Sequence, residues 1–270
     1  MNNQQQNPAQ GPVIEPKEEE SLPTPVTSLT KLSEGVYKLT LLAPFFSPQM
    51  VTEINVHLDV LEDLKAEKIS LITTSAHPKI FSSGGSLNYL STAPREEVNS
   101  FFHKFCLLGA RFVTLGFPTI AAINGYCIGL GVLFAMAHDF RYMVDTPGRF
   151  LSMPELNVAI SFSHGHISLL TSKLKGEVVD KLLLQAQRFY QEEALSGHLV
   201  EKVLPSGELM ETCRGLMEEL LRRSIDSETM RSLKLVLYED VVYNCRQRTL
   251  MNQEVLDYFV KVSNDSPKIT

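Results

Sequence analysis

The sequence predicts an α/β fold with a largely parallel β-sheet. Short apolar or alternating runs of strand length recur between residues 36 and 123, and a stretch with helical periodicity follows each of them. Strands and helices that alternate in this way form βαβ units, in which the strands lie parallel. The chain has 270 residues, of which 44% are hydrophobic, and this is enough for one large core.

The predicted elements begin after Gly35. Residues 36–41 alternate like a strand, and residues 51–65 carry their apolar side chains on one helical face. The short apolar run at residues 69–73 is typical of a buried strand. A loop rich in glycine and serine follows at residues 79–87.

The second half of this region continues the alternation. A helical stretch at residues 95–108 precedes a strand predicted at 117–123, and another helix is expected at 128–137. After Lys175 the sequence predicts mostly helix, over residues 177–186, 208–223 and 227–262. We therefore expect a core domain at residues 29–205 and a helical C-terminal region at residues 206–270.

The N-terminal residues 1–28 are rich in Gln, Asn, Pro and Glu and have few apolar side chains. Such a segment cannot bury enough surface to offset its ordering entropy, so we predict a disordered arm; the alternative is an arm that orders on a partner. The formal net charge is -6 and the chain has no basic run, which argues against a nucleic-acid partner.

The chain has four cysteines: Cys106, Cys127, Cys213 and Cys245. They show neither a CxxC pair nor the spacing of zinc ligands, and the chain has no secretory signal, so we expect free thiols in a reducing compartment. His164 and His166 lack a suitably spaced third ligand, and no metal site is predicted.

The stretch PTIAAINGYCIGLGVLFAMAHD, from Pro118 to Asp139, has no charged residue before His138. Its length is close to the roughly 20 residues that span a bilayer. However, Asn124-Gly125 is a strong turn signal where a span would continue, and no Lys or Arg cluster flanks the stretch. We therefore predict no transmembrane segment, because a buried strand that turns into a helix fits the same residues.

Part of the same stretch matches the nucleophile elbow of a hydrolase. Gly125 to Gly129 fits GxSxG with Cys127 in place of serine, and Asp180 and His198 follow in the order of acid and base. Asp180 falls in a helical stretch, however, and His198 follows a helix end, so nothing arranges a triad. We interpret Cys127 as a packing residue.

Four segments in a fixed order resemble the crotonase (enoyl-CoA hydratase/isomerase) superfamily. Residues 79–87 are similar to its FSAGADL-type loop. Residues 118–139 are similar to its P-x-IAA-x-NG run, which is followed by a glycine turn and then by a helix. Residues 150–160 are similar to F-x-x-PE-x-x-LGI, and residues 193–205 to EA-x-x-x-GLV-x-x-V-x-P. The resemblance implies the crotonase spiral fold of ββα units with a helical C-terminal region.

The resemblance also implies a site for acyl-CoA thioesters. Members of the family hold an enolate-like oxyanion with two backbone N–H donors. By position in the motifs, Gly85 and Leu130 supply these donors here. The neighbouring residues implied to form the substrate loops are Ser83, Gly84, Leu87, Gly129, Gly131 and Leu133.

The acid-base residues of the family distinguish its reactions. Hydratases use two glutamates; the first position is Leu133 here and the second is Glu155. One glutamate suits the movement of one proton between two carbons. The resemblance therefore implies an isomerase that converts 3-enoyl-CoA to 2-enoyl-CoA in fatty acid β-oxidation. The plant-type members share a pair like His138-Asp139, which we expect to cap and pack at a helix end.

The remaining implications concern cofactors, assembly and location. The coenzyme A thioester is the substrate, and no separate cofactor is expected. The family implies a homotrimer or hexamer built through the C-terminal helices, and a mitochondrial or peroxisomal location. Leu130, Ser86 and Ala159 depart from the family pattern, which leaves an alternative: a catalytically lapsed subunit of a larger assembly, docked through the N-terminal arm.

Overall fold

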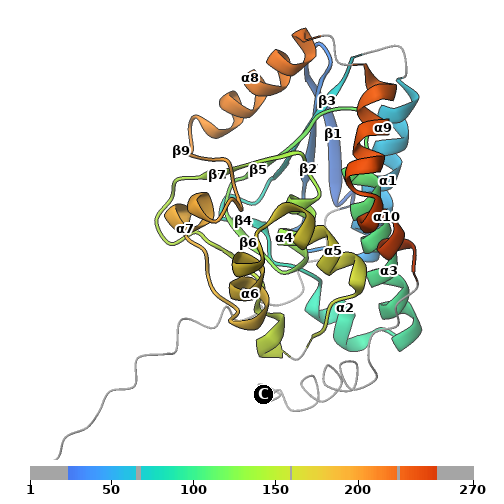
Figure 1. Ribbon diagram of the computed structural model, residues 1–270, viewed down its shortest axis with the longest axis vertical. Helices are drawn as coiled ribbons and strands as arrows, with labels where there is room; N and C mark the ends of the chain where they lie inside the picture. Colours follow the sequence, from blue (N-terminus) through green and yellow to red (C-terminus); the bar gives the residue numbers. More distant parts are fainter. Residues whose placement is uncertain (1–23, 65–67, 159, 224–225, 248–270) are drawn as a thin grey trace, which may run out of the picture.

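The computed structural model describes residues 24–64, 68–158, 160–223 and 226–247, in which helices surround two β-sheets (Figure 1). The larger sheet has six strands in the order β1-β2-β3-β5-β7-β9, and all neighbours are parallel except the antiparallel β1 and β2. Its strands are β1 (Thr27–Ser33), β2 (Val36–Leu41), β3 (Ser70–Ser75), β5 (Thr119–Ile123), β7 (Phe140–Val144) and β9 (Lys202–Leu204). The predicted α/β fold, and the strands expected at 36–41, 69–73 and 117–123, are confirmed.

The smaller sheet explains the path of the chain. Its three parallel strands are β4 (Ile80–Ser82), β6 (Tyr126–Ile128) and β8 (Leu151–Ser152). After β3, β5 and β7 of the larger sheet, the chain forms a strand of the smaller sheet and then a helix, which is the spiral of ββα units that the family resemblance implied. Strands of two or three residues carry too little periodicity to be predicted from the sequence.

Asn124 and Gly125 form the corner between the two sheets. Asn124 Nδ2 donates hydrogen bonds to Ser75 O and His77 O, each at 3.0 Å, and so joins the β5–β6 corner to the β3–β4 corner. A Cβ atom on Gly125 would overlap the backbone of Lys79, so this close approach requires glycine. The apolar stretch is therefore divided, and none of the described helices has the length and low polarity of a membrane span.

The helix α4 (Leu130–Met136) lies inside the core, and all seven of its residues are buried. It belongs to the main hydrophobic cluster together with Ala121 and Ile123 of β5. The alternate residues of that strand, Ile120 and Ala122, face the second cluster, which α8 (Leu209–Arg222) covers. Because β5 is buried on both faces, its sequence is apolar throughout.

The start of the fold lies earlier than predicted. The strand β1 begins at Thr27, so the boundary expected at residue 28 falls inside a strand. The Glu53 carboxylate accepts hydrogen bonds from Val26 N at 3.0 Å and Thr27 N at 2.8 Å, which holds the start of β1 against α1 (Pro48–Asp63). The rest of the predicted arm, residues 1–23, lies outside the described residues.

The C-terminal region is helical as predicted, but the single helix expected at 227–262 is wrong. The structure has α9 (Ser227–Leu237) and α10 (Glu239–Arg246), because Tyr238 leaves helical geometry with φ -114° and ψ 26°. Residues 248–270 lie outside the described part of the chain.

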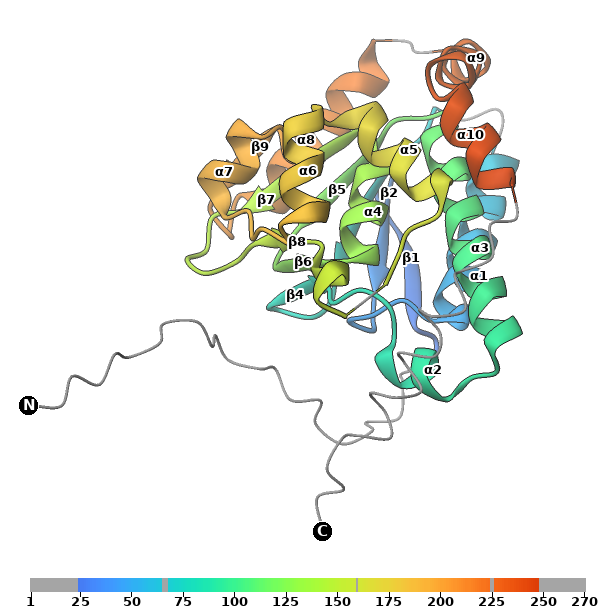
Figure 2. The same cartoon turned by 60° about the horizontal axis from the view of Figure 1, so that its bottom comes forward.

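The remaining helices complete the cover of the sheets. These helices are α2 (Leu87–Thr92), α3 (Arg95–Val113), α5 (His164–Lys173), α6 (Gly176–Leu184) and α7 (Gln191–Ser196). The helix α10 packs against α3 and α5 (Figure 2), and α8 lies on the other side of the larger sheet.

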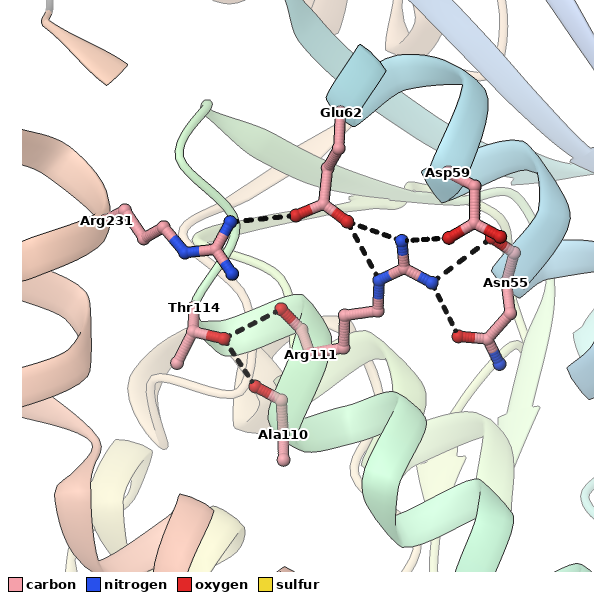
Figure 3. Close-up of polar contacts among 7 residues, drawn as sticks. All are labelled: Asn55, Asp59, Glu62, Ala110, Arg111, Thr114 and Arg231. Carbon is pink, nitrogen blue, oxygen red and sulfur yellow. Dashed lines mark hydrogen bonds and ion pairs between the residues drawn. The ribbon is translucent and has the colours of Figure 1, made fainter. Parts of the chain in front are cut away.

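A polar network joins the helices α1, α3 and α9 on the outside of the core (Figure 3). Arg111 of α3 donates to Asn55 Oδ1 at 2.9 Å, to Asp59 Oδ1 at 2.6 Å and to the Glu62 carboxylate, all on α1. Arg231 of α9 contacts the other Glu62 oxygen at 3.0 Å. Glu62 thus connects α9 to α1 and α3.

His138 and Asp139 pack at the end of α4, as predicted. His138 is buried, and each ring nitrogen lies 2.8 Å from a protein oxygen. The Asp139 carboxylate accepts from Thr119 N at 2.8 Å and pairs with Lys234 Nζ at 2.7 Å, and Lys234 also donates to Phe117 O at 3.1 Å. The ion pair between Asp139 and Lys234 therefore anchors α9 to the larger sheet.

Candidate active site

The first glycine loop (residues 83–86) follows β4 and pairs with the segment before α1. Phe46 N donates to Gly84 O at 2.7 Å, and Ser86 N donates to Phe46 O at 2.9 Å. Gly85 lies between Gly84 and Ser86, and in such a parallel bridge the N–H of the middle residue points to the opposite side. Gly84 adopts φ 100°, which favours glycine. The Gly85 N–H is therefore directed away from Phe46.

The second glycine loop (residues 128–131) joins β6 to α4. Gly129 adopts φ 56°, donates its N–H to Ser152 O at 2.9 Å and accepts from Val132 N at 2.9 Å. Leu130 is the first residue of α4, so its N–H has no helical partner one turn earlier. The N–H of Leu130 is therefore one of the helix-start donors that α4 itself does not use.

The two glycine loops lie against each other. A Cβ atom placed on Gly84 would be 3.8 Å from Leu130 N, and one on Gly85 would be 3.5 Å from Leu130 Cδ1. Two N–H donors from adjacent loops can share one oxygen that becomes negative during a reaction. The structure therefore brings together the two residues that were predicted to form the oxyanion hole.

Glu155 lies next to the second glycine loop. It belongs to the 3-10 helix Pro154–Val158 that follows β8, and it is 8% exposed. A Cβ atom on Gly129 would be only 2.6 Å from Glu155 Oε1. The other carboxylate oxygen, Oε2, is buried and has no hydrogen-bond partner among the residues that the structure describes. Burial raises the pKa of Glu155 to about 7.

The other predicted loop residues have different surroundings. Ser83 and Leu87 are exposed, with Leu87 at 66%. Gly131 is required by packing, since a Cβ atom there would lie 2.7 Å from Ser82 Cβ. Leu133, at the position of the first hydratase glutamate, is fully buried in α4. An apolar side chain there cannot activate water.

Two departures from the family pattern have structural explanations. Ser86 Oγ accepts a hydrogen bond from Tyr89 N at 3.3 Å and caps α2. The side chain of Leu130 packs against the first glycine loop, and the residue keeps its backbone N–H. Ala159 lies outside the described residues.

The hydrolase triad is not assembled, as predicted. Cys127 is completely buried in β6, and burial raises the pKa of its thiol. Asp180 and His198 are exposed, on α6 and directly after α7. Within the described part of the chain, no hydrogen bond joins any two of these three side chains. Cys127 is a packing residue.

The structure also gathers four side chains that no sequence pattern brought together. Cys106 of α3 and Cys245 of α10 have their Sγ atoms 2.8 Å apart. Ser163 Oγ lies 3.8 Å from Cys106 Sγ and 3.1 Å from His166 Nδ1. The two cysteines are 139 residues apart in the sequence, so no spacing pattern could indicate their contact.

A spiral of ββα units that carries two touching glycine loops and a buried glutamate defines the crotonase class of fold. A family model described as "Enoyl-CoA hydratase/isomerase" matches residues 31–266, and the chain belongs to this family.

Named relatives and solved structures agree with this assignment. "Enoyl-CoA delta isomerase 2, peroxisomal" of Arabidopsis thaliana is 27% identical over 207 residues, which cover 73% of this chain and 84% of the relative. "Carnitinyl-CoA dehydratase" of Escherichia coli strain K12 is 31% identical over 151 residues, 56% of each chain. The crystal structure of human mitochondrial delta3-delta2-enoyl-CoA isomerase superposes with a TM-score of 0.75 at 19% identity, and covers 88% of this chain and 97% of that one. The last comparison confirms the fold.

Proposed function

We propose that this protein is an acyl-CoA double-bond isomerase that converts 3-enoyl-CoA to 2-enoyl-CoA, with Glu155 as its acid-base residue. One observation carries the proposal: the Glu155 carboxylate is buried beside the second glycine loop, and one of its oxygens has no hydrogen-bond partner among the described residues. The apolar Leu133 supports isomerisation over hydration, because the first hydratase glutamate is absent. The A. thaliana delta isomerase provides further support.

The proposed reaction moves one proton and consumes no water. The ionised Glu155 removes a proton from C2, and the C–H electron pair forms a dienolate with its negative charge on the thioester oxygen. The N–H groups of Gly85 and Leu130 stabilise that oxygen. The protonated Glu155 then returns the proton to C4, so that the double bond lies between C2 and C3.

The environment of Glu155 suits both halves of this cycle. A group that first accepts and then donates a proton works best when its pKa is close to the working pH. Burial raises the pKa of Glu155 to about 7, far above the ordinary value of 4.5. Exclusion from water also strengthens hydrogen bonds to the dienolate oxygen.

The proposal extends to substrate, assembly and location. The coenzyme A thioester is the substrate, and the chemistry above needs no separate cofactor. A homotrimer or hexamer, and a mitochondrial or peroxisomal location, stay predictions from the family. They are in keeping with the names of the peroxisomal and mitochondrial isomerases to which the chain is similar.

Turnover of a 3-enoyl-CoA by the full chain tests the proposal, with the 2-enoyl product followed by its ultraviolet absorbance. We expect Glu155→Gln to lower kcat by at least about 100-fold, since it removes the acid-base group. Glu192→Gln, on the exposed face of α7, is the matched control and should keep full activity.

A second substrate separates the alternatives. With a 2-enoyl-CoA and water, we expect no measurable 3-hydroxyacyl-CoA. Hydration that depends on Glu155 would refute the isomerase in favour of a hydratase. Binding of acyl-CoA without any turnover would refute the enzyme and support a non-catalytic subunit.

A further inference from the structure

The sulfur atoms of Cys106 and Cys245 are already near bonding distance. Both thiols are free and buried, on α3 and α10 respectively, and their Sγ atoms lie 2.8 Å apart. A disulfide has an S–S length of about 2.04 Å, so each sulfur needs to move by only about 0.4 Å. The contact joins two helices that already pack together.

Gly165 of α5 permits this approach. A Cβ atom on Gly165 would lie 2.7 Å from Cys245 Sγ and closer still to Cys106 Sγ. Any larger residue would therefore push between the two sulfurs or displace α10. The three helices meet at a point where glycine leaves just enough room for two thiols.

Cys106 is the sulfur that a small oxidant can reach. It lines a cavity of about 20 Å³ together with Ser163 and His166. A single water needs roughly 10–15 Å³ of such space, so the cavity has room for one molecule of the size of hydrogen peroxide. Cys245 does not line this cavity.

The surroundings also favour the thiolate of Cys106. Its hydrogen bond with Cys245 lowers the pKa of Cys106, and the same contact raises the pKa of Cys245. Ser163 links Cys106 to His166, whose pKa burial lowers to about 4, so the imidazole stays neutral at pH 7. His166 Nε2 has no hydrogen-bond partner within the described ranges.

We propose that Cys106 and Cys245 form an oxidation site, at which a hydroperoxide converts the two thiols into a disulfide that ties α10 to α3. The Cys106 thiolate attacks one peroxide oxygen, the O–O bond breaks and hydroxide leaves, which gives a sulfenic acid. The Cys245 sulfur then attacks the Cys106 sulfur, and the S–O bond breaks with release of water. In total, two thiols and one hydrogen peroxide give one disulfide and two waters.

The disulfide closes a loop across 139 residues. Such a cross-link restricts the unfolded chain and should raise the melting temperature by about 5–15 °C in a chain of this size. Thiol reductants reverse it, so the covalent link between α10 and α3 follows the redox state.

Peptide mapping of the full chain tests the site directly. The protein is treated with stoichiometric hydrogen peroxide, free thiols are alkylated, and digestion is done without reductant. We expect one cross-linked peptide pair that contains Cys106 and Cys245, with Cys127 and Cys213 alkylated only after unfolding. Dithiothreitol should abolish the pair and reverse the rise in melting temperature.

A variant that retains both thiols serves as the second arm. Gly165→Ala should lower the yield of the cross-link at least about tenfold, because its methyl group separates the sulfurs. Gly176→Ala, at the start of α6 with open space around it, is the matched control and should cross-link like the wild type. Oxidation of Cys106 to sulfinic acid without a cross-link, or pairing of other cysteines, would overturn the proposal.

Discussion

The buried carboxylate of Glu155 should make the folded protein less stable at alkaline pH, and Glu155→Gln should relieve this cost. Burial raises the pKa of Glu155 from its ordinary value of 4.5 to about 7 in the folded state. The folded state therefore binds the proton more tightly than the unfolded chain does. The resulting stability is fully present below pH 4.5 and is lost as the pH rises through 7.

The magnitude follows from the two pKa values. One unit of pKa corresponds to about 1.4 kcal/mol, so ionisation of Glu155 lowers the free energy of unfolding by about 3 kcal/mol at pH 8. The neutral glutamine of Glu155→Gln carries no such cost. We expect the variant and the wild type to have similar stability near pH 4.5, and the variant to be more stable by about 3 kcal/mol at pH 8.

Urea unfolding of both full-length proteins between pH 4.5 and pH 8 measures this difference. Glu192→Gln on α7 is the matched control, and its difference from the wild type should not change across the range. A constant difference for Glu155→Gln at every pH would refute the reasoning, because it would mean that Glu155 titrates alike in both states. The same variant is predicted to lose activity, and a gain in stability together with that loss would indicate that Glu155 is kept for catalysis at a cost in stability.

Two further predictions concern the scaffold of the site. Lys234→Met leaves a buried partner carboxylate without its cation and should lower the free energy of unfolding by about 3–5 kcal/mol. Arg231→Met on the same helix removes an ion pair whose arginine is exposed and should cost at most about 1 kcal/mol. Equal losses in urea unfolding would contradict the difference in burial. Gly131→Ala places a methyl group against Ser82 and should destabilise α4 by about 1–3 kcal/mol in the same assay, whereas no loss beyond that of Gly176→Ala would disprove the close packing.

The departures from the family pattern are compatible with an active site. Ser86 caps α2. Leu130 has the same backbone N–H that a glycine would have at the start of α4. Glu155 keeps a buried oxygen to which no described residue donates a hydrogen bond. A subunit with no catalytic role gains nothing from a buried carboxylate oxygen that lacks a hydrogen-bond partner in the described part of the chain, because such a group costs stability. These observations support the enzyme over the non-catalytic alternative.

Periodicity in the sequence was sufficient for the long elements of the core. The strands β2, β3 and β5 and the helices α1, α3 and α4 were predictable because their side-chain pattern repeats within each segment. The ends were less accurate: α1 begins at Pro48, before its predicted start, because Ser47 caps it with a bond of 3.2 Å from Met50 N. The break at Tyr238 was missed, since the sequence there has no helix breaker.

The order of the site motifs was also present in the sequence, and the family resemblance assigned roles to Gly85, Leu130 and Glu155. What the tertiary structure decided is their environment. The contact between the two glycine loops, the burial that raises the pKa of Glu155 and the meeting of Cys106 with Cys245 all join segments far apart in the chain. Local pattern determines which segments are helix or strand, whereas the distance between two side chains and their exclusion from water depend on how those segments pack.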